Sequence, residues 1–266
     1  MTTDARPVHA GHLRGPFATW TRYSADTENL VHLTHEGLGM AVRLPELYRP
    51  LGMDEDEIRS AEWRAGIAQK EIDAGFPTLH AHSLLGLWGA LECLVEDIFR
   101  ESIKALPELL SGETLSKIKL PVSVLYGPEE DRANLLLFEL SRNLGADKRL
   151  GVGQFEVILD PVRLGGGVPP KIREAILHAQ QIRHIWAHRG GTADGQFVER
   201  RPGRARVGER VDMKADEFLP IMHGLHMYAL VILNRHMKNL GRAAVAAHCP
   251  GYEGVLTDDV AEVQPA

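Results

Sequence analysis

An arginine and two histidines stand close together in the segment QQIRHIWAHRGG, residues 180–191. Arg183, His184 and His188 lie at the end of a run of periodic apolar residues, which stops at a pair of glycines. A histidine titrates near neutral pH and can transfer protons, whereas an arginine keeps its charge and binds phosphate oxygens through two donors. These three side chains are therefore the first candidates for chemistry in the chain.

One interpretation of the segment is a metal site. His184 and His188 are four residues apart, which is the spacing of two zinc ligands on one helix face. The segment lacks the glutamate that follows the first histidine in zinc proteases, and the candidate third ligands are only His178, His223 and His226. Because none of these is a clear third ligand, we expect no metal.

A second interpretation is cleavage of RNA without a metal. That reaction needs groups to remove the 2′-OH proton and to protonate the leaving oxygen, and a cation to stabilise the charge on the phosphorane. On a regular helix Arg183 and His188 diverge by roughly 140°. They converge on one substrate only if the helix end unwinds or if two copies of the helix face each other. A third interpretation is an ordinary cationic helix end, which the helix dipole favours.

Helices are predicted around the motif. Apolar residues recur at steps of three and four over residues 78–106 and 171–188, and another strong helix is expected from about 216 to 240. A further helix is predicted to begin near Asp54, where acids suit its first turn, and to end before Gly75.

Three regions are expected along the chain. Residues 1–44 are predicted to be an irregular N-terminal arm, residues 45–245 a helical domain, and residues 246–266 a flexible acidic tail. Within the domain, residues 107–168 should hold short helices and loops, and residues 195–213 a short β-hairpin or an extended arm after the motif helix. The predicted fold class is mainly α, a bundle of long helices.

Bulk composition limits the classes of partner. The chain has 266 residues and a net charge of −6, so any RNA site must be a local basic patch. Cys93 and Cys249 give no disulfide framework, and the N-terminal residues lack an apolar signal core, so we expect a cytoplasmic protein. The most apolar late stretch, residues 218–234, holds two histidines and a proline, so we expect a buried helix and no membrane contact.

The segment IRHIWAHRGG resembles the motif of the HEPN superfamily, an arginine and a histidine separated by four residues, most often with asparagine after the arginine. Its surroundings are similar as well. An early long helix carries an aromatic residue and acids, as LWGALECLVEDIFRE does, and a glycine turn, an extended segment and a last apolar helix follow the motif. The likeness is to bacterial HEPN proteins of toxin and defence operons, over roughly residues 78–240.

The resemblance implies a HEPN-like helical bundle that forms a homodimer, with the motif helices at the interface. It also implies a metal-independent endoribonuclease without cofactors, in a toxin or defence role with an antitoxin or operon partner. By position, Arg183 would bind phosphate and His188 would be the acid or base. His184 replaces the usual asparagine and can donate a hydrogen bond or share the proton transfer. Because many members act without catalysis, the alternative is a non-catalytic module that binds RNA, a nucleotide or a protein partner.

Two carboxylates on the early long helix are further candidates. Glu92 and Glu96 lie one turn apart. One interpretation is that they orient Arg183 or His188 across the bundle. The other is a solvated acidic face that pairs with Arg100.

Arginines gather directly after the motif. They are Arg189, Arg200, Arg201, Arg204, Arg206 and Arg210. On an acidic chain this local basic patch can follow an RNA backbone with an affinity that falls as salt rises. An exposed arginine-rich hairpin that only confers solubility is the competing interpretation.

Overall fold

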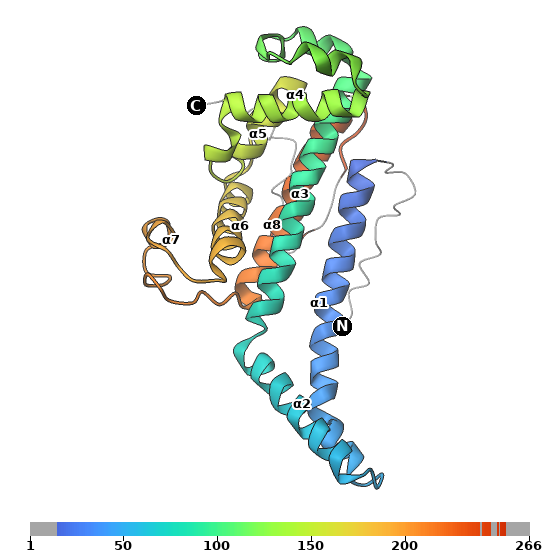
Figure 1. Cartoon of the computed structure of the whole chain (residues 1–266), viewed down its shortest axis with the longest axis vertical. Coiled ribbons are helices and arrows are strands. Elements are labelled where there is room, and N and C mark those ends of the chain that lie inside the picture. Colours follow the sequence, from blue (N-terminus) through green and yellow to red (C-terminus); the bar gives the residue numbers. More distant parts are fainter. Residues whose placement is uncertain (1–14, 240, 246–248, 250, 254–266) are drawn as a thin grey trace. The chain divides into compact units, whose positions relative to one another are not determined.

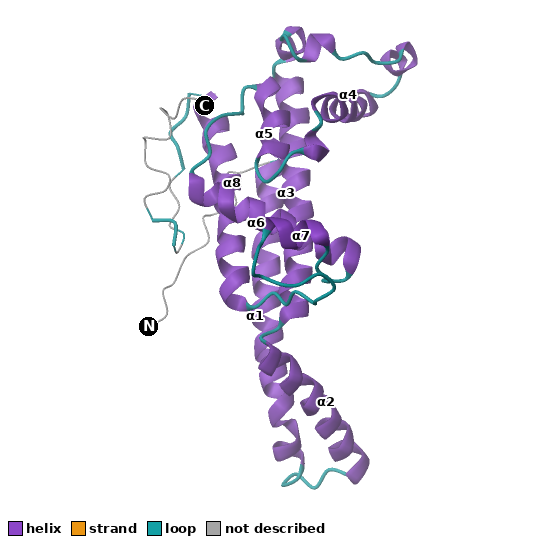
Figure 2. Ribbon diagram, turned by 90° about the vertical axis from the view of Figure 1, so that its left-hand side faces the viewer, coloured by secondary structure: helices purple, strands orange, loops and turns teal. Residues whose placement is uncertain are grey.

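The computed structural model describes residues 15–239, 241–245, 249 and 251–253. Over these residues the chain is mainly helical and contains no strand, which confirms the predicted fold class at that level (Figure 2). The helices are α1 (Pro16–Tyr48), α2 (Glu55–Ala74), α3 (Pro77–Ala105), α4 (Glu129–Leu144), α5 (Gly153–Leu159), α6 (Pro170–Arg189), α7 (Gly195–Arg200) and α8 (Ala215–Asn239) (Figure 1). Short 3-10 turns occur between α3 and α6.

The described residues form two compact units, each built from segments distant in sequence. The first unit, here called the network unit, takes in residues 15–22, 88–180 and those from 223 onward. The second, here called the motif unit, takes in residues 23–87 and 181–222. Helices α1, α3, α6 and α8 each contribute to both units. The candidate residues of the motif belong to the motif unit.

The motif unit buries apolar side chains from four of its helices. Val31 of α1, Ala61 and Ala68 of α2, Leu84 and Leu87 of α3, and Ile182 and Ile185 of α6 are all at most 8% exposed. Helix α2 begins as predicted, because Asp54 accepts a hydrogen bond from the Glu57 amide at 2.8 Å in a reciprocal capping box. It ends at Gly75, whose φ of 78° is the left-handed conformation that glycine adopts at low cost.

The network unit packs the second half of α3 against α5, α6 and α8. Its largest fully buried side chains include Trp88, Phe99, Leu159 and Ile172. The Trp88 and Phe155 ring centroids lie 5.4 Å apart, which is the contact distance of packed aromatic rings. This core accounts for the apolar stripes that were predicted on α3 and α6.

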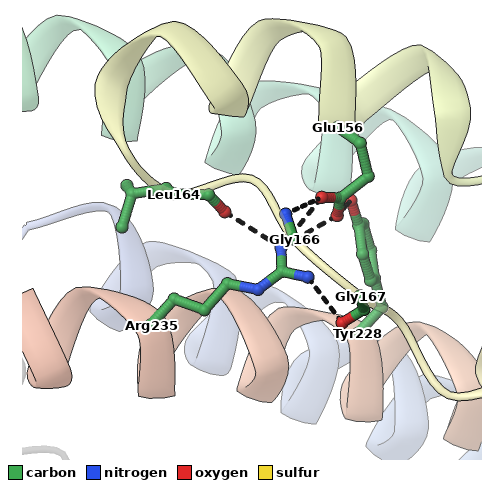
Figure 3. Close-up of polar contacts among 6 residues, drawn as sticks. All are labelled: Glu156, Leu164, Gly166, Gly167, Tyr228 and Arg235. Carbon is green, nitrogen blue, oxygen red and sulfur yellow. Dashed lines mark hydrogen bonds and ion pairs between the residues drawn. The ribbon is translucent and has the colours of Figure 1, made fainter. Parts of the chain in front are cut away.

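A polar network beside that core joins α5, α8 and a glycine-rich loop (Figure 3). The Arg235 guanidinium lies 2.9 Å from a Glu156 carboxylate oxygen, and its two terminal nitrogens also donate to the carbonyls of Leu164 and Gly167. The Tyr228 hydroxyl donates to Glu156 at 2.7 Å. Burial, followed by the charge of Glu156, raises the pKa of Tyr228 well above its usual value, so the hydroxyl stays a donor.

Two local expectations are wrong. Residues 16–44 are helical as part of α1, not an irregular arm, and residues 1–14 lie outside the described residues. Of the two alternatives predicted for the segment 195–213, a β-hairpin or an extended arm, the hairpin is not formed. Helix α7 occupies the first part of the segment, and near its far end Arg210 pairs with Thr192 in an isolated antiparallel bridge. Most of the predicted tail, 246–266, also lies outside the described residues.

None of the helices in the described part of the chain combines the length and the apolar character that a bilayer span requires.

Candidate functional site

Helix α6 ends at a double glycine that packs against a tryptophan. Gly190 and Gly191 have φ values of 57° and 82°, in the left-handed region, and the Gly191 amide donates to the Ile185 carbonyl at 3.1 Å. A Cβ atom at Gly191 would lie 2.8 Å from the Trp186 ring. Glycine is therefore required there both for the turn and for the close approach.

Trp186 also fixes the segment that follows α6. Its ring is buried, and its Nε1 donates to the Val211 carbonyl at 3.1 Å. The Arg210 guanidinium lies 5.2 Å from the ring centroid, within cation–π range. Further along, the buried His80 ring places Nδ1 3.1 Å from the Met213 carbonyl. The arginine-rich segment is thus a loop of the motif unit, and both of its ends make contacts within that unit.

The two motif histidines lie one above the other on the solvent side of α6. The ring centroids of His184 and His188 are 5.1 Å apart and their planes cross at 61°. Both residues are exposed, and 47% of the His184 side chain is accessible. The predicted juxtaposition of the two rings is present, and His184 faces solvent rather than the core.

An aspartate that was not singled out from the sequence faces the same cluster. Asp194 accepts a hydrogen bond from the Phe197 amide at 2.8 Å and so caps α7. Its second carboxylate oxygen lies 3.9 Å from His184 Nε2 and 3.8 Å from Arg189 Nε. The signal available in the sequence was an aspartate directly before a short amphipathic run, DGQFVER, which is typical of a helix N-cap.

Arg183 and His188 do not converge within one copy of the chain. Helix α6 continues to Arg189, so the two side chains keep the divergence of a regular helix, roughly 140°. Arg183 is half-buried, whereas His188 is exposed. Of the two ways in which they could share a substrate, the unwound helix end is not what the structure has. Two facing copies of the helix remain.

The predicted RNA-binding arginines fall into two groups. Arg189, Arg200 and Arg206 are exposed, and Arg201 is half-buried. Arg204 differs because its guanidinium donates to a Glu217 carboxylate oxygen at 2.8 Å and to the Asp212 carbonyl at 2.7 Å. The hydrogen bond to Glu217 is the main cause that raises the pKa of Arg204. Arg204 therefore connects the loop to α8.

The two candidate orienting carboxylates have neighbours on their own helix. Glu92 accepts a hydrogen bond from Trp88 Nε1 at 2.7 Å. Glu96 lies 2.9 Å from the Arg100 guanidinium, which also meets Asp97 at 2.6 Å. The pairing with Arg100 is the one that the acidic-face interpretation predicted. The orienting role of Glu92 and Glu96 stays a prediction.

The other histidines that were weighed as metal ligands belong to the network unit. The ring of His226 contacts that of Trp20 edge to face, with centroids 5.9 Å apart. Burial, with a smaller effect from the charge of His223, lowers the pKa of His226 to about 4. Across the part of the chain that the structure describes, no three His, Cys, Asp or Glu side chains gather as ligands for a metal ion.

Comparison of the chain with protein-family models, curated proteins and solved structures found no match. The HEPN resemblance therefore depends on the motif and on the order of elements around it. Membership of the HEPN superfamily is therefore a proposal.

Proposed function

We propose that this protein binds RNA at the end of helix α6 and cleaves it without a metal, as an endoribonuclease of HEPN type. The exposed histidine pair carries the proposal. His184 and His188 lie 5.1 Å apart on the solvent side of the helix end, beside the exposed Arg189. Two imidazole rings next to an exposed guanidinium suit proton transfer at a phosphodiester.

The proposed reaction uses the substrate's own nucleophile. The 2′-oxygen attacks the adjacent phosphorus, and the bond from phosphorus to the 5′-oxygen breaks. His188 takes the 2′-OH proton or delivers one to the leaving 5′-oxygen, with His184 assisting. The Arg183 guanidinium stabilises the charge on the phosphorane through two donors. The products are a 2′,3′-cyclic phosphate end and a 5′-OH end.

The divergence of Arg183 and His188 on one helix makes a homodimer part of this proposal. A second copy would supply the arginine or the histidine that the first copy cannot direct to the same phosphate. A C2 interface repeats each contact, so two equivalent sites would form. A role in toxicity or defence, with an antitoxin or operon partner, follows from the resemblance and belongs to the same proposal.

One observation favours a second candidate function. His184 faces solvent with 47% of its side chain accessible, instead of turning inward beside a catalytic centre. A non-catalytic module would use the same exposed rings and arginines to bind RNA, a nucleotide or a protein partner. It would bind RNA without cutting it.

The deciding experiment is cleavage of a broad RNA panel by the purified protein in EDTA. Wild type, Arg183→Ala and His188→Ala are compared with Arg173→Ala, an exposed arginine at the start of the same helix. We expect cutting by wild type and Arg173→Ala, cyclic phosphate ends, and at least about a hundredfold loss in the other two variants. An uncut panel that is nevertheless bound would establish the module instead.

Mixing the two inactive variants tests the shared site. If each site combines Arg183 of one copy with His188 of the other, a mixed dimer keeps one intact site. Random exchange of subunits then restores about a quarter of the wild-type rate. If both residues act within one copy, the mixture stays inactive.

A further inference from the structure

Helix α1 carries an apolar seam that the fold leaves in solvent. Leu30, Leu33, Met40 and Leu47 are 58%, 62%, 53% and 48% exposed. When Gly37 and Leu44 are added to these four residues, the spacing alternates between three and four residues. The seam is defined as Leu30, Leu33, Gly37, Met40, Leu44 and Leu47. All six residues belong to the motif unit.

This pattern is the heptad repeat of a helix that packs against another helix. Helix α1 already uses a different face for its own unit, where Val31 and Pro45 are buried. Scattered exposed leucines are common, but a row at heptad spacing over more than two heptads is the narrow stripe of a helix–helix seam. The second face of α1 therefore fits one helix of another chain.

We propose that this helix is α1 of a second copy of the protein, running antiparallel about a twofold axis between Leu38 and Gly39. In that register the layers are Leu30 over Leu47, Leu33 over Leu44, and Gly37 over Met40 of the other copy. Each layer occurs twice, as a twofold interface requires. A Cβ atom at Gly37 would meet nothing within 4 Å, so the space above it is open to the Met40 side chain.

Charge at the edge of the seam agrees with this register. Glu36 and Arg43 flank the seam on the same edge, one heptad apart. Antiparallel pairing brings Glu36 of one copy beside Arg43 of the other, twice. Glu36 now lies 3.2 Å from His32, an exposed pair that contributes little and can be exchanged. The opposite edge, with Thr34 and Ala41, carries no charge to oppose the pairing.

A parallel arrangement fits less well. It would place Gly37 against Gly37 and leave a gap, since neither residue has a side chain. It would also bring the edge that holds Glu36 and Arg43 against the uncharged edge of the second copy. The antiparallel arrangement alone gives both complementary volumes and complementary charges.

The inference does not rest on the proposed function. Its first test measures the molecular mass in solution and not the cleavage of RNA. Wild type should have twice the chain mass of 29.4 kDa by light scattering. The variant Leu33→Gln/Leu47→Gln should lose this association and have a lower mass than wild type, with an unchanged helical circular dichroism spectrum because these side chains are exposed. The matched control, Leu150→Gln/Leu219→Gln, changes two leucines of comparable exposure outside α1 and should remain dimeric.

A charge exchange then tests the register. Glu36→Arg and Arg43→Glu each place like charges together and should weaken the dimer at least about tenfold, since two sites change in each dimer. The double variant Glu36→Arg/Arg43→Glu restores opposite charges and should recover a dissociation constant near that of wild type. A double variant weaker than both single variants would overturn the antiparallel register.

Crosslinking gives the orientation directly. In a Cys93→Ser/Cys249→Ser background, Leu30→Cys/Leu47→Cys should form a disulfide-linked dimer on oxidation, whereas Leu30→Cys alone should not. A crosslink from Leu30→Cys alone would show the parallel arrangement. A wild-type protein that stays monomeric over about a hundredfold range of concentration would overturn the proposal, as would a Leu33→Gln/Leu47→Gln variant with the same mass as wild type.

Discussion

The molecule contains two clusters of arginine, acid and aromatic side chains that differ in how tightly they are held. In the network unit, Arg235 meets both oxygens of Glu156 at 2.9 and 3.0 Å, and the two side chains are only 16% and 18% exposed (Figure 3). At the end of α6, Asp194 lies 3.8 Å from Arg189 and 3.9 Å from His184. The first cluster makes short contacts between largely buried side chains, whereas the second makes long contacts from Asp194 to an exposed arginine and an exposed histidine.

The difference is the one expected between a structural cluster and the binding site proposed on α6. Glu156 accepts from Arg235, from Tyr228 and from the Gly166 amide, so its oxygens are already committed within the fold. Such a network fixes the glycine loop, and breaking it leaves a charge without its partner. Exposed cations and rings at long distances lose little when they turn toward a ligand. This contrast is why we place the function on α6.

The largest expected effect comes from removing the central cation of the network. Arg235→Met removes the cation that faces Glu156 and the donor to the Leu164 and Gly167 carbonyls, and we expect the free energy of unfolding to fall by about 3 kcal/mol. Thermal unfolding measured by circular dichroism should then begin roughly 10 °C lower. His188→Ala, at an exposed position, is the control and should change stability by less than about 0.5 kcal/mol. Equal losses of stability in both variants would show that the two clusters do not differ in their contribution to the fold.

The network also shows what the sequence does not reveal. Glu156 and Arg235 are 79 residues apart in the chain, and no local pattern pairs them. Helices α3, α6 and α8 were predictable because their apolar periodicity is local, and the boundaries of α6 agree with prediction to within one residue at each end. The histidine pair follows from helix geometry alone, since residues four apart share a face. Asp194 was missed because its N-cap signal does not reveal that its second carboxylate oxygen faces His184 and Arg189 in the folded chain.

Helix α1 was missed for a compositional reason. The glycines, prolines, threonines and histidines of residues 1–44 suggested an irregular chain. Yet Thr21, Thr27 and Thr34 each donate a side-chain hydrogen bond to the carbonyl four residues back. Those bonds satisfy the hydroxyls without ending the helix. The hairpin expected after the motif failed because its alternation is short, and the cap at Asp194 favours a helical turn instead.

The second-largest effect is expected at the end of α6. His188→Ala should lower the rate of RNA cleavage at least about a hundredfold, because a proton-transfer group is lost, while its stability stays that of wild type. Single-turnover cleavage in EDTA and thermal unfolding of the same sample separate the two quantities. A variant that cuts RNA at the wild-type rate would remove His188 from the proposed chemistry.

A smaller effect is expected at His184, where two replacements differ. Asparagine retains a hydrogen-bond donor at this exposed position and alanine does not. We therefore expect His184→Asn to cut at close to the wild-type rate and His184→Ala to cut about tenfold more slowly, which is the value of one hydrogen bond. If both variants lose activity equally, the imidazole itself transfers a proton and His184 is a second acid or base.

The smallest expected effect distinguishes two arginines of the arginine-rich segment that follows α6. Arg206 is exposed, whereas Arg204 is bound to Glu217 and to the Asp212 carbonyl. If Arg206 contacts a phosphate, Arg206→Gln should reduce the slope of log binding constant against log salt concentration by about 0.7, the value for one contact with a single strand. Arg204→Gln should leave that slope unchanged and lower the free energy of unfolding by about 1 kcal/mol, since it breaks a partly exposed ion pair and a hydrogen bond to a carbonyl. Fluorescence anisotropy with a labelled RNA over a salt series measures the slope. An unchanged slope for Arg206→Gln would confine the RNA contact to α6 itself, whereas a reduced slope for Arg204→Gln would show that the bridge to Glu217 opens when RNA binds.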